Sequence, residues 1–311
     1  MDALIVLLSG GVGGAKLAEG LAALTGRLVI IGNTGDDLEW YGLRVCPDLD
    51  IVMYTLAGLV DRERGWGLTG DTFHTLEMLG RYGEPGWFRL GDRDLATALL
   101  RTRWLEAGIP LTDVTGRICR ALGIEARLFP MCNDPVRTVI VTPDGEVPFQ
   151  EYFVARAARD EVHGIRFAGV ETARLSGEVS DALDAADLIV FAPSNPFVSL
   201  GPILSVPGMR DAIRRSRAPK IGVSPLIQGR AVKGPAEAMM RSLGHRPDAV
   251  GVAIMYQDLL DMFVIDTLDA GLAPEIQALG LDVEVRETLM TDAHAKRALA
   301  AEIVRLARIK V

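Results

Sequence analysis

Leu4-Ile-Val-Leu-Leu8, Ser9-Gly-Gly-Val-Gly-Gly-Ala-Lys16 and Arg27-Leu-Val-Ile-Ile31 follow one another closely at the start of the chain and decide its fold. The two short apolar runs are typical of strands that are covered on both faces. Ala15–Leu24, between them, is rich in Ala and Leu and predicts a helix. A strand, a helix and a second strand in this order predict a right-handed parallel crossover.

Apolar runs of the same kind recur further along the chain, separated by helical patterns. We expect strands at Asp187–Ala192, Lys220–Val223 and Ala249–Ile254. This alternation predicts an α/β fold with a Rossmann-like, open, mostly parallel sheet and helices on both faces. Residues from about 62 to 128 show mainly helical patterns instead. We therefore expect a single α/β nucleotide-binding domain over residues 1–311, with a mostly helical insertion at about 62–128.

Composition narrows the classes of function. The chain has 311 residues, 33 Lys plus Arg against 41 Asp plus Glu, and a net charge of -8. An acidic chain is a poor candidate for nucleic-acid binding, which needs a basic surface. No apolar stretch approaches the roughly 20 residues that span a bilayer. From the charge and the lack of a long apolar stretch, we expect no nucleic-acid or membrane partner. The three cysteines are far apart and fit free thiols, which indicates a cytoplasmic location.

The glycine-rich segment is the first candidate binding element. Gly10, Gly11, Gly13 and Gly14 would let the backbone approach a phosphate, and free amides at a helix start favour an anion. Lys16 would add a cation. The spacing fits neither a Walker loop, since Leu17 follows Lys16, nor a Gly-x-Gly-x-x-Gly dinucleotide loop. A tight turn with an exposed lysine stays open as the alternative.

Acidic residues follow the second strand and the next turn. Asn33 and Asp36 could hold a ribose, an acceptor or a metal ion, or could form an ordinary turn. Asp48 and Asp50 share one side if their segment is extended, and with Asp61 they suit Mg²⁺, which prefers one or two carboxylates plus substrate oxygens. The alternative for these acids is a solvated capping cluster.

Two further polar segments complete the candidate site. Arg89 and Arg93 could hold phosphate or a polyol, and Asp92 lies between them. Pro193-Ser-Asn-Pro196 leaves a predicted buried strand at its carboxyl end, where open α/β sheets place ligands. We expect Ser194, Asn195 and Pro196 to meet the glycine segment in one cleft, although a rigid connection is also possible.

Taken together and in order, these motifs resemble the 2-phospho-L-lactate transferase family of coenzyme F-420 biosynthesis. The motifs are Ser9–Lys16, Asn33–Asp37, Pro47–Asp50, Leu90–Asp94, Pro193–Pro196 and Tyr256-Gln-Asp258, and they span nearly the whole chain.

The resemblance implies a particular reaction. A 2-phospholactyl, phosphoenolpyruvyl or phosphoglyceryl group would pass from a guanosine-diphospho donor to the ribityl hydroxyl of 7,8-didemethyl-8-hydroxy-5-deazariboflavin, releasing GMP. It also implies a Mg²⁺ requirement and a homodimer. Asp50 matches the acceptor-binding aspartate of the family and is our candidate catalytic residue. Arg89 stands where some members have a lysine that contacts the deazaflavin.

Two alternatives of other classes stay open. The strand–glycine–helix start with Asp36 also favours an NAD(P)-dependent oxidoreductase. A non-catalytic protein that binds a deazaflavin or a nucleotide would use the same fold.

Overall fold

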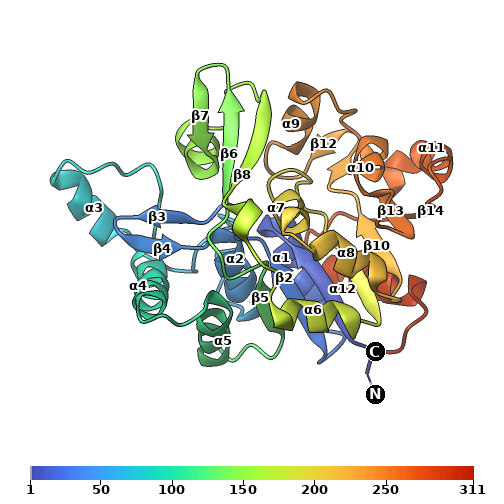
Figure 1. Cartoon of the computed structure of the whole chain (residues 1–311), viewed down its shortest axis with the longest axis horizontal. Coiled ribbons are helices and arrows are strands. Elements are labelled where there is room, and N and C mark those ends of the chain that lie inside the picture. The colour runs from blue at the N-terminus through green and yellow to red at the C-terminus, as the bar shows by residue number, and fades with distance from the viewer. Residues whose placement is uncertain (1) are drawn as a thin grey trace.

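Seven parallel strands form the central sheet of the computed structural model, which describes residues 2–311. The strand order is β14-β13-β10-β9-β1-β2-β5 (Figure 1), and every pairing is parallel. This confirms the predicted fold class. The strands are β1 (Ile5–Ser9), β2 (Leu28–Gly32), β5 (Arg127–Pro130), β9 (Leu188–Phe191), β10 (Lys220–Val223), β13 (Met262–Asp266) and β14 (Asp282–Arg286).

Helices cover both faces of this sheet, and each face has its own apolar core. All residues of β1 and β2 are buried, as the unbroken apolar runs predicted. One core joins the sheet to α1 (Gly11–Ala22), α2 (Pro47–Leu56), α5 (Leu111–Ala121) and α12 (Ala293–Leu306). The other joins it to α6 (Gly177–Asp184), α7 (Leu200–Ser205), α8 (Met209–Arg215), α9 (Ala236–Ser242), α10 (Ala249–Tyr256) and α11 (Ala273–Gln277).

The region between β2 and β5 contains the helices that were predicted there. They are α3 (His74–Arg81), α4 (Asp92–Glu106) and α5. α4 packs on a hairpin of β3 (Leu38–Trp40) and β4 (Leu43–Val45), where Trp40 contacts Trp87 edge to face. α3 and this hairpin extend to one side of the sheet (Figure 1).

A smaller antiparallel sheet follows β5. β6 (Arg137–Thr142) pairs with β7 (Gly145–Pro148) across a turn at Pro143-Asp144, and β8 (Gly164–Ala168) pairs with the other edge of β6. β7 ends at Pro148, and a π-helical turn follows at Glu151–Ala155. A short hairpin of β11 (Leu226–Ile227) and β12 (Arg230–Ala231) follows β10, and two 3₁₀ turns lie at Val170–Thr172 and Thr267–Leu272.

One predicted strand is wrong. Residues 249–254 lie in α10, whose N-cap Asp248 accepts a hydrogen bond from Gly251 N at 3.0 Å. An apolar run of this length is compatible with a buried helix as well as a buried strand. The next strand is instead β13, which the sequence analysis did not identify.

The order of the strands reverses between β1 and β9, which both leave the sheet at the same edge. Open α/β sheets bind ligands in the crevice at such a switch point, outside the carboxyl ends of the strands. The glycine segment follows β1 and Pro193–Pro196 follows β9, so the fold brings both candidate segments to this crevice. Within residues 2–311, no helix has the length and apolar character needed to cross a membrane.

Candidate functional site

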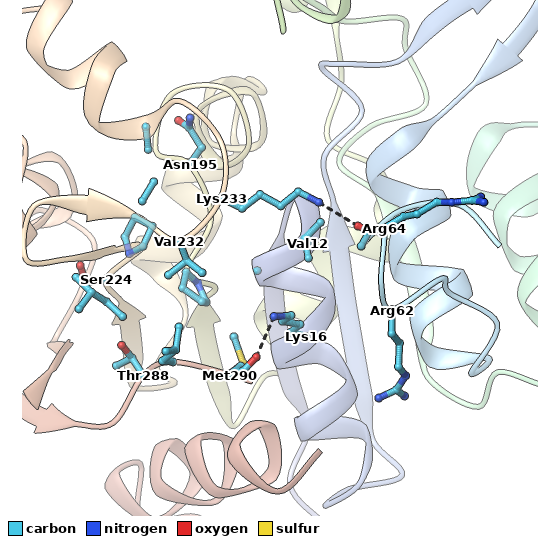
Figure 2. Close-up of a pocket in the computed structure, with 18 of the residues that line it drawn as sticks. Val12, Lys16, Arg62, Arg64, Asn195, Ser224, Val232, Lys233, Thr288 and Met290 are labelled. Atoms are coloured by element: carbon cyan, nitrogen blue, oxygen red, sulfur yellow. Dashed lines mark hydrogen bonds between the residues drawn. The ribbon is translucent and has the colours of Figure 1, made fainter. Parts of the chain in front are cut away.

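A cavity of about 400 Å³ opens at the carboxyl ends of β1, β9 and β10 (Figure 2). Lys16 and Asn195, predicted from distant parts of the sequence, both line it. Its walls come from the start of α1, the segments after β9 and β10, residues 62–65, residues 231–233 and residues 288–290. The lining residues used below are Val12, Gly13, Lys16, Arg62, Arg64, Gly65, Asn195, Ser224, Lys233 and Met290.

The glycine segment is helical rather than a loop before the helix. α1 starts at Gly11, so Lys16 lies in its second turn. A Cβ on Gly13 would lie 2.4 Å from Pro193 O, and one on Gly14 would lie 2.2 Å from Ser9 Oγ. Gly13 therefore allows α1 to pack against the segment after β9, and Gly14 allows it to pack against the end of β1. Of the segment, Val12 and Gly13 line the cavity, and the first-turn amides of a helix favour an anion.

Lys16 points into the cavity, where its ammonium donates to Met290 O at 2.9 Å (Figure 2). Burial, and then the charge of Lys296, lowers the pKa of Lys16, while Glu19 opposes the shift. Among the described residues, no carboxylate forms an ion pair with this lysine. Its charge is therefore available to an anion in the cavity.

Three more cations line the same cavity, and they differ in how they are compensated. Arg62 pairs with Glu19 at 2.9 Å and Arg64 pairs with Asp61 at 3.5 Å. Lys233 donates to Gly65 O at 3.2 Å and, within residues 2–311, has no carboxylate partner. Partial burial, followed by the charge of Lys16, lowers the pKa of Lys233. Two lysines from opposite walls thus carry uncompensated charge.

In the segment after β9, one side chain has a structural role and another lines the cavity. The hydroxyl of Ser194 is buried, accepts from Gly10 N at 3.3 Å and donates to Gly10 O at 2.7 Å, so it fastens this segment to the start of α1. Asn195 lines the cavity, and its side-chain oxygen accepts from Phe197 N at 2.9 Å. Pro196 is buried outside the cavity wall.

Asn33, Asp36 and Asp48 form a buried polar cluster on the other side of the start of α1. Asn33 Nδ2 donates to Asp48 Oδ2 at 2.9 Å and to Asp36 Oδ1. Burial, and then the neighbouring charges of Asp48 and Asp37, raise the pKa of Asp36 well above its usual range. Burial raises the pKa of Asp48 to about 6, although Asn33 and the amide of Gly11 oppose the shift.

Asp50 belongs to a different buried cluster. Its carboxylate binds Arg101 in bidentate fashion, with Arg101 Nη1 at 3.1 Å from Asp50 Oδ2. Residues 47–56 are helical and not extended, so Asp48 and Asp50 point to different partners instead of sharing a side. Neither lines the cavity that contains Lys16.

The three predicted metal ligands do not converge. Asp61 stabilises its own loop by accepting from Glu63 N at 3.1 Å and Arg64 N at 3.0 Å. Across the described chain, no group of three or more His, Cys, Asp or Glu residues could hold a metal ion. Asp36 and Asp48 are nevertheless two adjacent carboxyl groups without a cationic partner. Such a pair fits Mg²⁺, which takes one or two carboxylates and completes its shell with substrate and water oxygens.

Arg89, Asp92 and Arg93 lie outside the cavity. Asp92 accepts from Thr72 Oγ1 and from the amides of His74 and Thr75, which ties the start of α3 to α4 and lowers the pKa of Asp92. Arg93 donates to Thr69 O at 3.1 Å. Both side chains thus have structural partners.

Arg89 is exposed, and its guanidinium lies 4.5 Å from the centre of the Phe73 ring. Arg64 stacks on the same ring at 5.3 Å, and Trp66 contacts its edge at 6.4 Å. Because Arg64 also lines the cavity, this Arg–aromatic cluster adjoins it.

Sequence reasoning missed Arg62 and Arg64, and it gave no role to Lys233. Lys233 lies in the Pro/Gly-rich segment after β10, a composition that indicates a loop at the ligand edge of the sheet. The arginines lie in the loop that Asp61 stabilises. Nothing in the local pattern shows that these segments face each other across α1.

An open parallel sheet with a cation-lined cavity at its switch point is the architecture of nucleotide-binding α/β proteins. Residues 5–306 match the family described as "2-phospho-L-lactate transferase CofD". The chain is 45% identical to a phosphoenolpyruvate transferase of Streptomyces griseus, covering 97% of this chain and 98% of that protein. It is 36% identical to a 2-phospho-L-lactate transferase of Methanosarcina barkeri, with the same two shares covered.

The chain therefore belongs to the CofD family of 2-phospho-L-lactate transferases. It is an enzyme of the transferase class, as the motifs predicted. The fold is also similar to that of a UPF0052 family protein from Bacillus halodurans, with a TM-score of 0.64 at 17% identity over 98% of this chain and 99% of that one.

Family membership replaces the two alternatives left open by the sequence. An NAD(P)-dependent oxidoreductase would use an acid at the end of β2 for the ribose. Asp36, the candidate for that role, is instead buried with Asn33 and Asp48. The relatives named above are transferases, so a purely binding protein is not supported either.

Proposed function

We propose that the enzyme transfers a phosphorus-linked three-carbon acid from a guanosine-diphospho donor to the ribityl hydroxyl of a deazaflavin and releases GMP. The family and the names of its relatives support the reaction type. The observation that carries the donor assignment is the pair of lysines, Lys16 and Lys233, which reach one cavity from opposite walls without carboxylate partners. Phosphate oxygens are the ligands that such cations bind.

The donor would lie across the start of α1. Its diphosphate would accept hydrogen bonds from Lys16 and from first-turn amides of α1 near Val12 and Gly13. The guanine would extend along the wall formed by Asn195 and Ser224.

The deazaflavin would approach from the side of α3. Its flat ring suits the Arg–aromatic cluster of Phe73, Trp66 and Arg89, since guanidinium groups and aromatic rings both stack on planar ligands. Arg64 belongs to this cluster and to the cavity wall, so an acceptor placed there would reach the donor. We retain Arg89 as an acceptor-binding residue on this ground.

The reaction would be an in-line displacement at the outer phosphorus of the donor. The acceptor oxygen forms the new P–O bond, the P–O bond to GMP breaks, and the hydroxyl proton leaves to a base or to water. Asp48 and Asp36 would hold Mg²⁺, which supplies positive charge that stabilises the departing GMP. Lys16 would neutralise the diphosphate from the opposite side, and α1 would hold both groups in register.

Asp50 stays a prediction as the group that orients the acceptor hydroxyl. Both of its oxygens bind Arg101, so a direct contact would require the acceptor to replace part of that pairing. Turnover of Asp50→Asn separates the possibilities. Loss of kcat with unchanged folding supports a role at the acceptor hydroxyl, whereas turnover close to wild type removes Asp50 from catalysis.

We also propose that the enzyme is a cytoplasmic homodimer. Exposed apolar side chains on α3 and α4, including Met78 at 40%, Leu99 at 50% and Leu100 at 43%, offer a surface that a second copy could cover. Light scattering of the purified protein measures the oligomeric state directly, and a monomer at micromolar concentration would exclude the dimer.

The reaction itself is tested by mass spectrometry. The purified enzyme is incubated with Mg²⁺, the deazaflavin and, separately, guanosine-diphospho donors that carry lactate, enolpyruvate or glycerate. We expect one donor to give a phosphodiester adduct of the deazaflavin together with equimolar GMP. If GMP forms without an adduct, the enzyme is a hydrolase of the donor and the proposed transfer is wrong.

A further inference from the structure

Lys233 lies in a short strap, residues 232–235, that connects β12 to α9. Both ends of the strap are anchored: Ala231 N donates to Glu237 Oε2 at 3.0 Å, and Pro235 O accepts from Met239 N at 2.9 Å. Between them Val232 is 60% exposed. The strap therefore crosses the cavity's edge with little packing of its own.

A second loop, residues 61–67, lies on the opposite wall. It is closed on itself, because Asp61 N donates to Gly67 O at 3.0 Å and Gly65 N donates to Asp61 O at 2.8 Å. Across the described chain, the bond from Lys233 Nζ to Gly65 O is the one hydrogen bond between this loop and the strap (Figure 2).

Gly65 is shaped for this contact. Its φ of +69° is a conformation that residues with a Cβ rarely adopt, and a Cβ there would lie 3.0 Å from the Lys233 ammonium. Both features favour glycine at the point where the lysine crosses the cavity. The carbonyl nevertheless provides only a neutral acceptor for a full positive charge.

We propose that Lys233 is a second anion-binding lysine, which leaves the carbonyl of Gly65 when a diphosphate ester enters and clamps it against Lys16. This inference rests on the proposed function and names a further binding residue in the donor cavity. A hydrogen bond to a charged oxygen is stronger than one to a neutral carbonyl, so the exchange is favourable once the anion is present. The strap moves with the lysine and covers the bound group.

Calorimetric titration tests the clamp, with inorganic pyrophosphate and GDP as the ligands and the full-length protein with Mg²⁺. We expect Lys233→Gln to weaken pyrophosphate binding about 10-fold to 100-fold, the range for losing a charge-assisted hydrogen bond. Lys233→Arg should retain most of the affinity. Lys310→Gln removes the same charge near the C-terminus, away from the cavity, and should bind like wild type.

Hydrogen exchange gives the second readout. Pyrophosphate should slow amide exchange in residues 61–67 and 232–235 of the wild type, and in Lys233→Gln it should no longer protect residues 232–235. Equal pyrophosphate affinity of wild type and Lys233→Gln would overturn the clamp. Failure of the proposed function would give a different result. The affinity for pyrophosphate would still depend on Lys233, but no donor would yield a deazaflavin adduct.

Discussion

Two charged regions flank the start of α1, and they are opposite in sign and in exposure. On one side, Lys16 and Lys233 face an open cavity and are held only by main-chain carbonyls. On the other side, Asp36 and Asp48 are buried beside Asn33 without a cationic partner. Asp50 lies in a separate buried cluster, where it pairs with Arg101.

The difference shows how the protein distributes its uncompensated charge. Arg101 is fully buried and bound by Asp50 on two sides, which is the arrangement of an ion pair that maintains the fold. The two lysines lack such partners and can exchange their carbonyls for a ligand at low cost. The charges that are free to bind a ligand, on Lys16 and Lys233, therefore lie in the cavity. The charges that maintain the fold, on Asp50 and Arg101, lie between α2 and α4.

Breaking the Arg101 pair should have the largest effect. Arg101→Met leaves the buried carboxylate of Asp50 without a partner, which costs about 3–5 kcal/mol of the free energy of unfolding. Urea denaturation measures the loss. Arg103→Met, an exposed change on the same helix, is the control. The double variant Arg101→Met/Asp50→Asn should regain part of the loss, and no regain would show that Arg101 acts independently of Asp50.

Removing a cavity lysine should instead affect binding and leave the fold intact. Lys16→Gln should lower kcat/KM by about 10-fold to 100-fold, because it removes a charge-assisted contact to the donor worth about 1.5–3 kcal/mol. The urea midpoint should change little. A variant that loses stability but keeps its kcat/KM would place Lys16 with the structural charges.

Removing the contact between Ser194 and Gly10 should have a smaller effect on both stability and ligand binding. Ser194→Ala removes two buried hydrogen bonds to one backbone unit, and we expect a loss of about 1–2 kcal/mol in unfolding free energy. GDP affinity should fall several-fold, since Gly10 precedes the first turn of α1. Ser180→Ala on α6 is the control. Equal unfolding free energy and equal GDP affinity of the two variants would contradict a role for the Ser194–Gly10 contact.

Asp94, near Asp50 on the acidic side, should make the stability of the protein depend on pH. Burial, and then the charge of Asp50, raises the pKa of Asp94 to about 7. Between about pH 4 and 7 the unfolded chain releases this proton and the folded chain keeps it, so its contribution to stability falls as pH rises through that window. Asp94→Asn does not titrate, so its Tm relative to wild type should rise from pH 4 to 7 and then level off. A Tm difference that is constant with pH would contradict the shift.

The sequence predicted four of the seven strands of the sheet and the edge at which the cavity lies. The runs at 4–8, 27–31, 187–192 and 220–223 were predicted as strands because residues buried on both faces are continuously apolar. The run at 249–254 has the same composition and forms a helix, because period and composition do not separate the two over so short a length.

The chemistry of single residues was less accessible. Asp48 and Asp50 look like a pair in the sequence, yet one helical turn directs them to Asn33 and to Arg101. Lys233 is 217 positions after Lys16 in the numbering, and only the crossovers of the sheet bring both to one cavity. Long-range pairing of this kind leaves no local pattern to detect.

The most direct test of the account is a crystal structure with GDP bound. We predict that the diphosphate lies over the start of α1, with oxygens within hydrogen-bond distance of Lys16 Nζ and Lys233 Nζ and with Gly65 O released. A diphosphate bound elsewhere, with both lysines still on the carbonyls of Met290 and Gly65, would contradict it.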